Sequence, residues 1–179
     1  FAKAGEMIDE QFQTMIRRVQ KEPRNTEHLV ALGDYIKYIK GKLLDDMREK
    51  ILADTKIAHQ LMSITDLSPE HYKAVTDSVL WLEKIQPILK KAETMFETFQ
   101  TDMEKKCQNA ADKLRMDLNA FTPNLKNLFE LSDFGNIVAY NKFIKTFLRQ
   151  INKFNEDMEW INKEEALFKW PQSTYPELV

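Results

Sequence analysis

The chain has 179 residues, a length that fits one domain or one elongated bundle. Its 26 basic and 28 acidic residues leave a net charge of -2, and this balance gives no electrostatic case for binding nucleic acid, which would need a basic face. Glycine and proline are scarce, at 4 and 6 residues, and 30% of the residues are charged, a composition typical of long helices.

The cysteine content indicates the cellular compartment of the protein, and the two ends of the sequence indicate that it is a fragment. Cys107 is the only cysteine and cannot form an internal disulfide, which favours a reducing, intracellular compartment. No apolar run approaches the ~20 residues that cross a bilayer. The chain begins at Phe1 without a methionine and stops abruptly at Val179, so we expect it to be a fragment of a longer protein.

Apolar residues recur at spacings of three and four in the first part of the chain, which predicts amphipathic helices over about 2–21 and 26–64. Gly33 and Gly41 lie inside the second helix, where each costs about 1 kcal/mol. The apolar stripe continues through both, so we predict one uninterrupted helix. Steps of four along 43–51 indicate a local change of supercoiling.

Capping signals mark where these helices begin. Asn25 or Thr26 can cap the second helix. Ser68 is a good N-cap and Pro69 suits the first helical position, so a third helix is predicted over about 69–120.

Proline and glycine signals divide the rest of the chain. Pro87 should kink the third helix or divide it in two. The Thr-Pro pair at 122–123 repeats the cap-then-proline signal and predicts a separate short helix over 123–131. A turn is predicted at 132–136, followed by a last helix over about 137–169.

No stretch alternates with a period of two, so no sheet is predicted. Stripes of this length cannot be buried alone, and the helices should therefore pack antiparallel. We predict an all-α fold, a single elongated bundle over 1–179, with a short extended exit segment at 170–179.

Residues suited to catalysis or metal binding are scattered. No GxxxxGK[ST] or GxGxxG loop occurs, so nucleotide binding within this chain is not expected. His28, His59 and His71 are far apart in sequence and form no zinc pattern. Cys107 falls on an apolar stripe and should be a small core residue. We predict no catalytic, cofactor or metal site, and no enzyme activity of this chain.

The charged and apolar faces have ordinary structural interpretations. Lysines alternate with acidic residues, so no polybasic membrane-binding face is predicted. The aromatic and methionine stripes could bind a partner helix, but their spacing favours an intramolecular core. Phe147 and Phe154 should then be core residues of the last helix.

The last helix ends in a distinctive segment that carries an acidic pair, a Leu-Phe, a short polar turn and a Tyr-Pro-x-Leu. The residues of this pattern are Asn162, Glu164, Glu165, Leu167, Phe168, Trp170, Tyr175, Pro176 and Leu178. Over about 155–178 the sequence resembles dynein heavy chains, above all the axonemal ones, at the place where the tail ends and the linker begins.

The same residues have a physical interpretation. Pro171 should end the helix. Glu164 and Glu165 lie late in a helix, where the dipole disfavours anions, so they should have basic partners. Tyr175 precedes a proline and should be extended, and Leu178 should anchor the exit on a following bundle.

The resemblance implies a structural, force-transmitting part of an ATP-driven microtubule motor of cilia, without a cofactor of its own. ATP and magnesium would belong to the parent motor. The implied partners are the rest of the dynein heavy chain, dynein intermediate or light chains and the axonemal doublet microtubule complex, with neither nucleic acid nor membrane. The implied location is the cytoplasm and cytoskeleton, in the cilium axoneme. The alternative is a spectrin-like or membrane-tethering coiled-coil rod segment.

Overall fold

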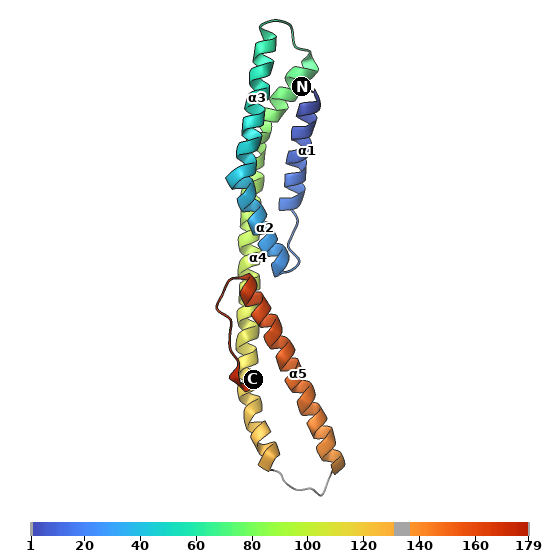
Figure 1. Ribbon diagram of the computed structural model, residues 1–179, viewed down its shortest axis with the longest axis vertical. Coiled ribbons are helices and arrows are strands. Elements are labelled where there is room, and N and C mark those ends of the chain that lie inside the picture. Colours follow the sequence, from blue (N-terminus) through green and yellow to red (C-terminus); the bar gives the residue numbers. More distant parts are fainter. Residues whose placement is uncertain (1, 131–136, 179) are drawn as a thin grey trace. The chain divides into compact units, whose positions relative to one another are not determined.

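The computed structural model describes residues 2–130 and 137–178, and every regular element within them is a helix (Figure 1). In chain order the elements are α1 (Ala2–Val19), α2 (Thr26–Tyr38), a π-helical turn (Ile39–Leu43), α3 (Leu44–Met62), α4 (Pro69–Glu130), α5 (Ile137–Leu167) and a 3-10 turn (Pro176–Leu178). The all-α prediction is confirmed.

Two of the predicted caps are present. The side chain of Asn25 accepts a hydrogen bond from the backbone N–H of His28 over 2.8 Å, at the start of α2. Ser68 Oγ accepts from the N–H of His71 over 3.4 Å, and Pro69 occupies the first position of α4. Each cap satisfies a backbone donor that the first helical turn leaves without an intrahelical partner.

Contacts group the chain into two compact units, residues 1–100 and 101–179, where the sequence predicts a single bundle. The first unit contains α1, α2, the π turn, α3 and the first half of α4. The second contains the rest of α4, α5 and the exit segment. Each unit has its own hydrophobic core.

In the first unit, α1 runs parallel to α4. Asp9 accepts a hydrogen bond from the Trp81 indole over 2.9 Å, and Phe12 stacks on Trp81 with ring centroids 5.3 Å apart. The second and third helices run the other way, because Gly33 approaches Phe96 while Lys40, further along the chain, pairs with Glu93. Successive helices therefore run antiparallel, in an up–down–up order that leaves α1 parallel to α4.

The π turn separates α2 from α3 and corrects the predicted continuous helix over 26–64. The Leu44 N–H donates to the Ile39 carbonyl, five residues earlier. Ile39 and Leu44 are both buried, whereas Leu43, the expected stripe position, is only half-buried. The turn absorbs one extra residue and so keeps the apolar stripe on the core.

Helix α4 continues through both of its internal prolines, so the predicted end near 120 and the separate helix over 123–131 are wrong. Pro87 and Pro123 are exposed, and the carbonyls that lose a partner there can bond to water. Beside Pro123, the Thr122 hydroxyl donates to the Leu118 carbonyl over 2.9 Å. The turn predicted at 132–136 lies outside the described residues.

In the second unit, α4 and α5 pack antiparallel around an aromatic core. Phe121 contacts Phe147 and Phe154, with ring centroids 4.9 and 5.4 Å apart. Lys106, earlier in α4, lies over Trp160, later in α5. Phe147 and Phe154 are buried, as the sequence predicts.

We expect Gly33→Ala and Gly41→Ala to change stability in opposite directions. A Cβ at Gly33 would lie 2.6 Å from Phe96 Cε2, whereas one at Gly41 would have nothing within 4 Å. Overpacking costs about 1–3 kcal/mol and outweighs the helix-propensity gain of about 1 kcal/mol at Gly33, while at Gly41 only the gain remains. Urea denaturation measures both variants. Equal stabilisation would show that Phe96 does not occupy this space.

Candidate functional site

The end of α5 closes with a Schellman motif, two residues before the predicted end at 169. The Trp170 N–H donates to the Glu165 carbonyl over 2.8 Å, and the Lys169 N–H donates to the Ala166 carbonyl over 3.1 Å. Lys169 adopts φ 59°, a left-handed conformation that usually requires glycine here. This residue, rather than Pro171, ends the helix and turns the chain back.

Glu165 fastens the exit segment to the end of α5. Its side chain is 6% exposed. The Ser173 N–H donates to Oε2 and the Ser173 hydroxyl donates to Oε1, each over 2.6 Å. Bonds to a buried carboxylate are charge-assisted and strong. Neutral donors from the chain itself therefore hold Glu165, where the sequence suggests a basic partner. Glu164 is also buried.

Tyr175 anchors the exit in the core of the second unit. Its side chain is 3% exposed, and its carbonyl accepts from the Leu178 N–H over 3.0 Å. Its hydroxyl has no hydrogen-bond partner among the described residues. Burial raises the pKa of Tyr175. The Ser173 hydroxyl, which donates to Glu165 and lies near the Tyr175 oxygen without a hydrogen bond to it, opposes this shift, and the charge of Glu165 adds to it. The exit segment, which the sequence predicts to be extended, is extended only in part, because it ends in the 3-10 turn at Pro176–Leu178.

Cys107, on α4, belongs to the same cluster as Tyr175 and is 1% exposed, which confirms it as a core residue. Burial raises the pKa of the Cys107 thiol from 9.0 to about 11, and the negative charges of Glu165 and Glu164 add to the shift. A thiol with so high a pKa is a poor nucleophile at neutral pH. Its place beneath the exit makes it useful as a reporter.

We expect the raised pKa of Cys107 to make stability fall between pH 9 and 11. In this range the unfolded chain releases the thiol proton and the folded chain keeps it, so the stabilisation present below pH 9 is lost as pH rises through about 11. The loss should be about 2–3 kcal/mol. Denaturation at several pH values measures it. The Cys107→Ala variant should lack this part of the pH dependence; an identical slope would contradict the assignment.

The other predicted junction residues surround this exit. The Phe168 and Trp170 rings stack 5.0 Å apart, and both pack against the second core, as does Leu178. Leu178 therefore packs against the core of its own unit. Asn162 and Leu167 are half-buried, Pro176 is exposed, and the Asn162 side-chain oxygen has no partner among the described residues.

Sequence reasoning did not identify Ser173 and Lys169. No sequence signal links a serine to a glutamate eight residues earlier, because that contact depends on the chain reversing direction. The reversal depends on the left-handed Lys169, and lysine is not a residue that predicts this conformation.

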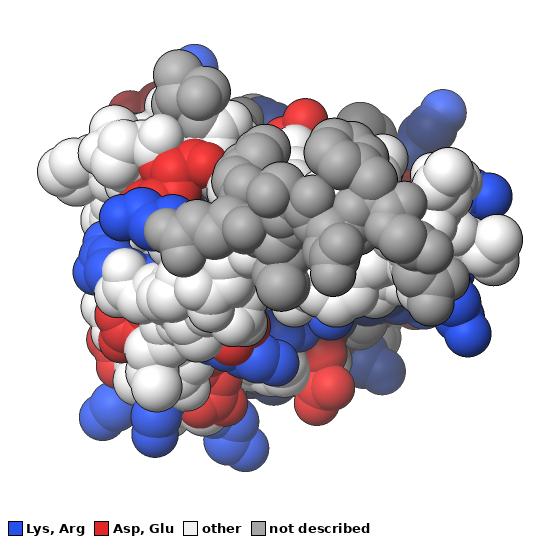
Figure 2. Space-filling model, turned by 90° about the horizontal axis from the view of Figure 1, so that it is seen from below, with Lys and Arg blue, Asp and Glu red and all other residues white. Residues whose placement is uncertain are grey.

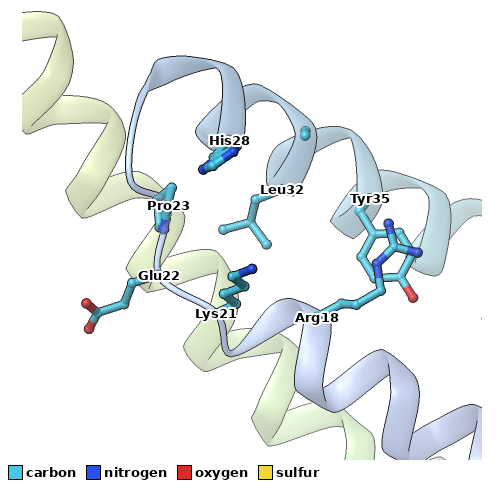
Figure 3. A pocket seen from close by; sticks show the side chains of 8 residues that line it. Arg18, Lys21, Glu22, Pro23, His28, Leu32 and Tyr35 are labelled. Atoms are coloured by element: carbon cyan, nitrogen blue, oxygen red, sulfur yellow. The ribbon is translucent and has the colours of Figure 1, made fainter.

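A separate cavity of about 280 Å³ lies at the elbow between α1 and α2 (Figure 3). The guanidinium of Arg18 lies 3.8 Å from the centroid of the Tyr35 ring. In this view Leu32 lies between His28 and Lys21, which also line the cavity. The charged side chains are exposed, and their interactions are therefore screened by water. Over residues 2–130 and 137–178, no group of three His, Cys, Asp or Glu could hold a metal ion.

The visible surface carries charges of both signs. Figure 2 shows basic and acidic side chains interspersed, without a broad single-sign area on the described part of this face. None of the described helices combines the length and the apolar character needed to cross a membrane.

The chain is similar to an axonemal dynein heavy chain over almost its whole length. It is 26% identical to dynein axonemal heavy chain 12 of Homo sapiens over 181 residues, which cover 99% of this chain. The identities with the proteins of the same name from Rattus norvegicus and Mus musculus are 23% and 22%, each over 176 residues and 98% of this chain. The similarity thus extends well upstream of 155–178, the segment where the resemblance is specific.

The chain spans about 6% of the length of these relatives. No protein-family model matches the chain. No solved structure matches it either.

Proposed function

We propose that this chain is a part of an axonemal dynein heavy chain that joins the tail to the linker and transmits force between them. The observation that carries the proposal is the similarity to dynein axonemal heavy chain 12 over 98–99% of the chain. An all-helical chain without a glycine-rich phosphate loop fits a structural role.

The fastened exit supports the junction role. A segment that carries load needs defined points of attachment where it enters and leaves its bundle. Glu165 bonds to Ser173, and Tyr175 and Leu178 pack into the core, so the last described residues are attached to the bundle at several points. In the dynein heavy chains that this segment resembles, the tail ends and the linker begins here, and this supports the proposed junction role.

In this proposal the ATPase, with its ATP and magnesium, belongs to the parent motor. The partners are the remaining heavy chain, dynein intermediate or light chains and the axonemal doublet microtubule complex, and the location is the axoneme. The assignment rests on the named relatives and on fold-level analogy.

The test is to sequence the parent transcript beyond Val179. The proposal predicts a helical linker followed by repeated GxxxxGK[ST] loops, since these carry phosphate binding in a motor of this class. A stop codon soon after Val179, or further heptads without such a loop, would overturn it.

A rod segment of a spectrin-like or membrane-tethering protein is the alternative, and the up–down–up order of the first unit would suit it. Such a rod should dimerise through its stripes, or bind anionic liposomes in a salt-dependent manner. Sedimentation of the purified chain, alone and with liposomes, distinguishes the dynein proposal from the rod alternative. The dynein proposal predicts a monomer that does not bind liposomes.

A further inference from the structure

The docked exit combines features that favour docking with features that oppose it. The bonds from Ser173 to Glu165 and the burial of Tyr175 favour the docked state. The left-handed conformation of Lys169 opposes it, since an L-residue is strained there. The Tyr175 hydroxyl opposes it as well, because it is buried without a partner and would regain water on release.

We propose that residues 169–178, the exit strap, open and close as a unit over Cys107 while α4 and α5 stay folded. Opening relaxes Lys169 and hydrates the Tyr175 hydroxyl, and it breaks the bonds to Glu165. Elements held by few contacts open locally, below the free energy of global unfolding. The use of such a strap as a load-dependent latch rests on the proposed function, but its motion can be tested in this chain alone.

Tension would act directly on this equilibrium. A pull on the chain beyond the strap does work when the strap leaves α4, so load favours the open state. The helices resist longer, because their backbone bonds lie within continuous elements. The strap would therefore be the first part of the second unit to yield.

Cys107 reports the opening, because it is the only cysteine of the chain, is 1% exposed and lies in one cluster with Tyr175. Iodoacetamide reaches the thiol only when part of this cluster moves away, and the strap is the part of it that lies outside the two long helices. At a fixed mildly alkaline pH, the alkylation rate is therefore proportional to the open population of the strap.

Three variants should shift the equilibrium between the docked and the open strap without altering the charge of Glu165. Ser173→Ala removes the hydroxyl bond and should raise the alkylation rate about tenfold. Its matched control is Thr174→Ala, an exposed neighbour, which should leave the rate unchanged. Lys169→Gly should lower the rate about three- to fivefold. Tyr175→Phe should lower it or leave it unchanged, because removing an unpartnered buried hydroxyl costs nothing.

Urea separates strap opening from unfolding of the whole unit. Opening exposes less surface than unfolding of the whole unit, so at low urea the alkylation rate should depend less on urea than it does once the helices unfold. A steep dependence at all concentrations would overturn the proposal. So would a Tyr175→Phe rate well above that of the unchanged chain. These results would leave the transcript test, and with it the proposed dynein assignment, unaffected.

Discussion

Replacing Phe154 by alanine should lower the free energy of unfolding of the second unit by about 3–5 kcal/mol, the range for a large aromatic lost from a core. Phe154 is 4% exposed and meets Phe121 edge-to-face. Its removal leaves a cavity between α4 and α5, which are held apart there by other rings. Chemical denaturation followed by circular dichroism measures the change.

Phe143→Ala is the matched control for Phe154→Ala. Phe143 is on the same helix but 48% exposed, and its ring contacts Phe147. We expect a loss of about 1 kcal/mol or less, because little of its surface leaves water on folding. If both variants lost equally little free energy of unfolding, the aromatic stripe of α5 would pack against a partner and not in this core.

The second large effect is expected in the first unit, where Phe12→Ala should cost about 3–5 kcal/mol. Phe12 is completely buried and stacks on Trp81 with an interplanar angle of 8°. The substitution removes both the buried area and the stacking contact. Chemical denaturation followed by circular dichroism measures the loss.

Met7→Ala, in the same helix, is the corresponding control, since Met7 is 58% exposed. It should change the free energy of unfolding by less than about 0.5 kcal/mol, as surface substitutions usually do. Comparable losses at the two positions would mean that α1 does not pack on α4 through the face that contains Phe12.

The fold class and most of the helix starts could be predicted from the sequence, because they depend on local signals. Ser68 and Pro69 begin α4 as their residue types require. The apolar stripes located Phe147, Phe154 and Cys107 in the core. Each of these predictions needs only the spacing of residues along one helix.

Other features depend on contacts that the sequence does not show. Pro123 carries a strong stop signal, yet it faces solvent within α4, where water can replace the lost bond. Position 33 is occupied by glycine because the ring of Phe96, on a different helix, fills the space that a Cβ would need. A single extra residue near Gly41 is absorbed by a π turn, which has no reliable sequence signal.

The sequence indicates which residues belong to the candidate site but not which contacts they make. In the structure, the exit segment docks through Glu165 and Tyr175. Ser173 donates to the Glu165 carboxylate, because Lys169 reverses the chain and brings Ser173 back to the end of α5. Tertiary geometry decides that partner, and local propensity does not.

The central structural claim is that the exit is fastened to the end of α5 through Glu165. Amide hydrogen exchange at Ser173 tests it most directly, because this N–H donates to Glu165 Oε2 over 2.6 Å. We predict that its exchange is slowed roughly tenfold or more relative to an unstructured peptide, and that Glu165→Ala abolishes this protection while the α5 amides keep theirs. Exchange of the Ser173 amide at the unstructured rate in the unchanged chain would contradict the account.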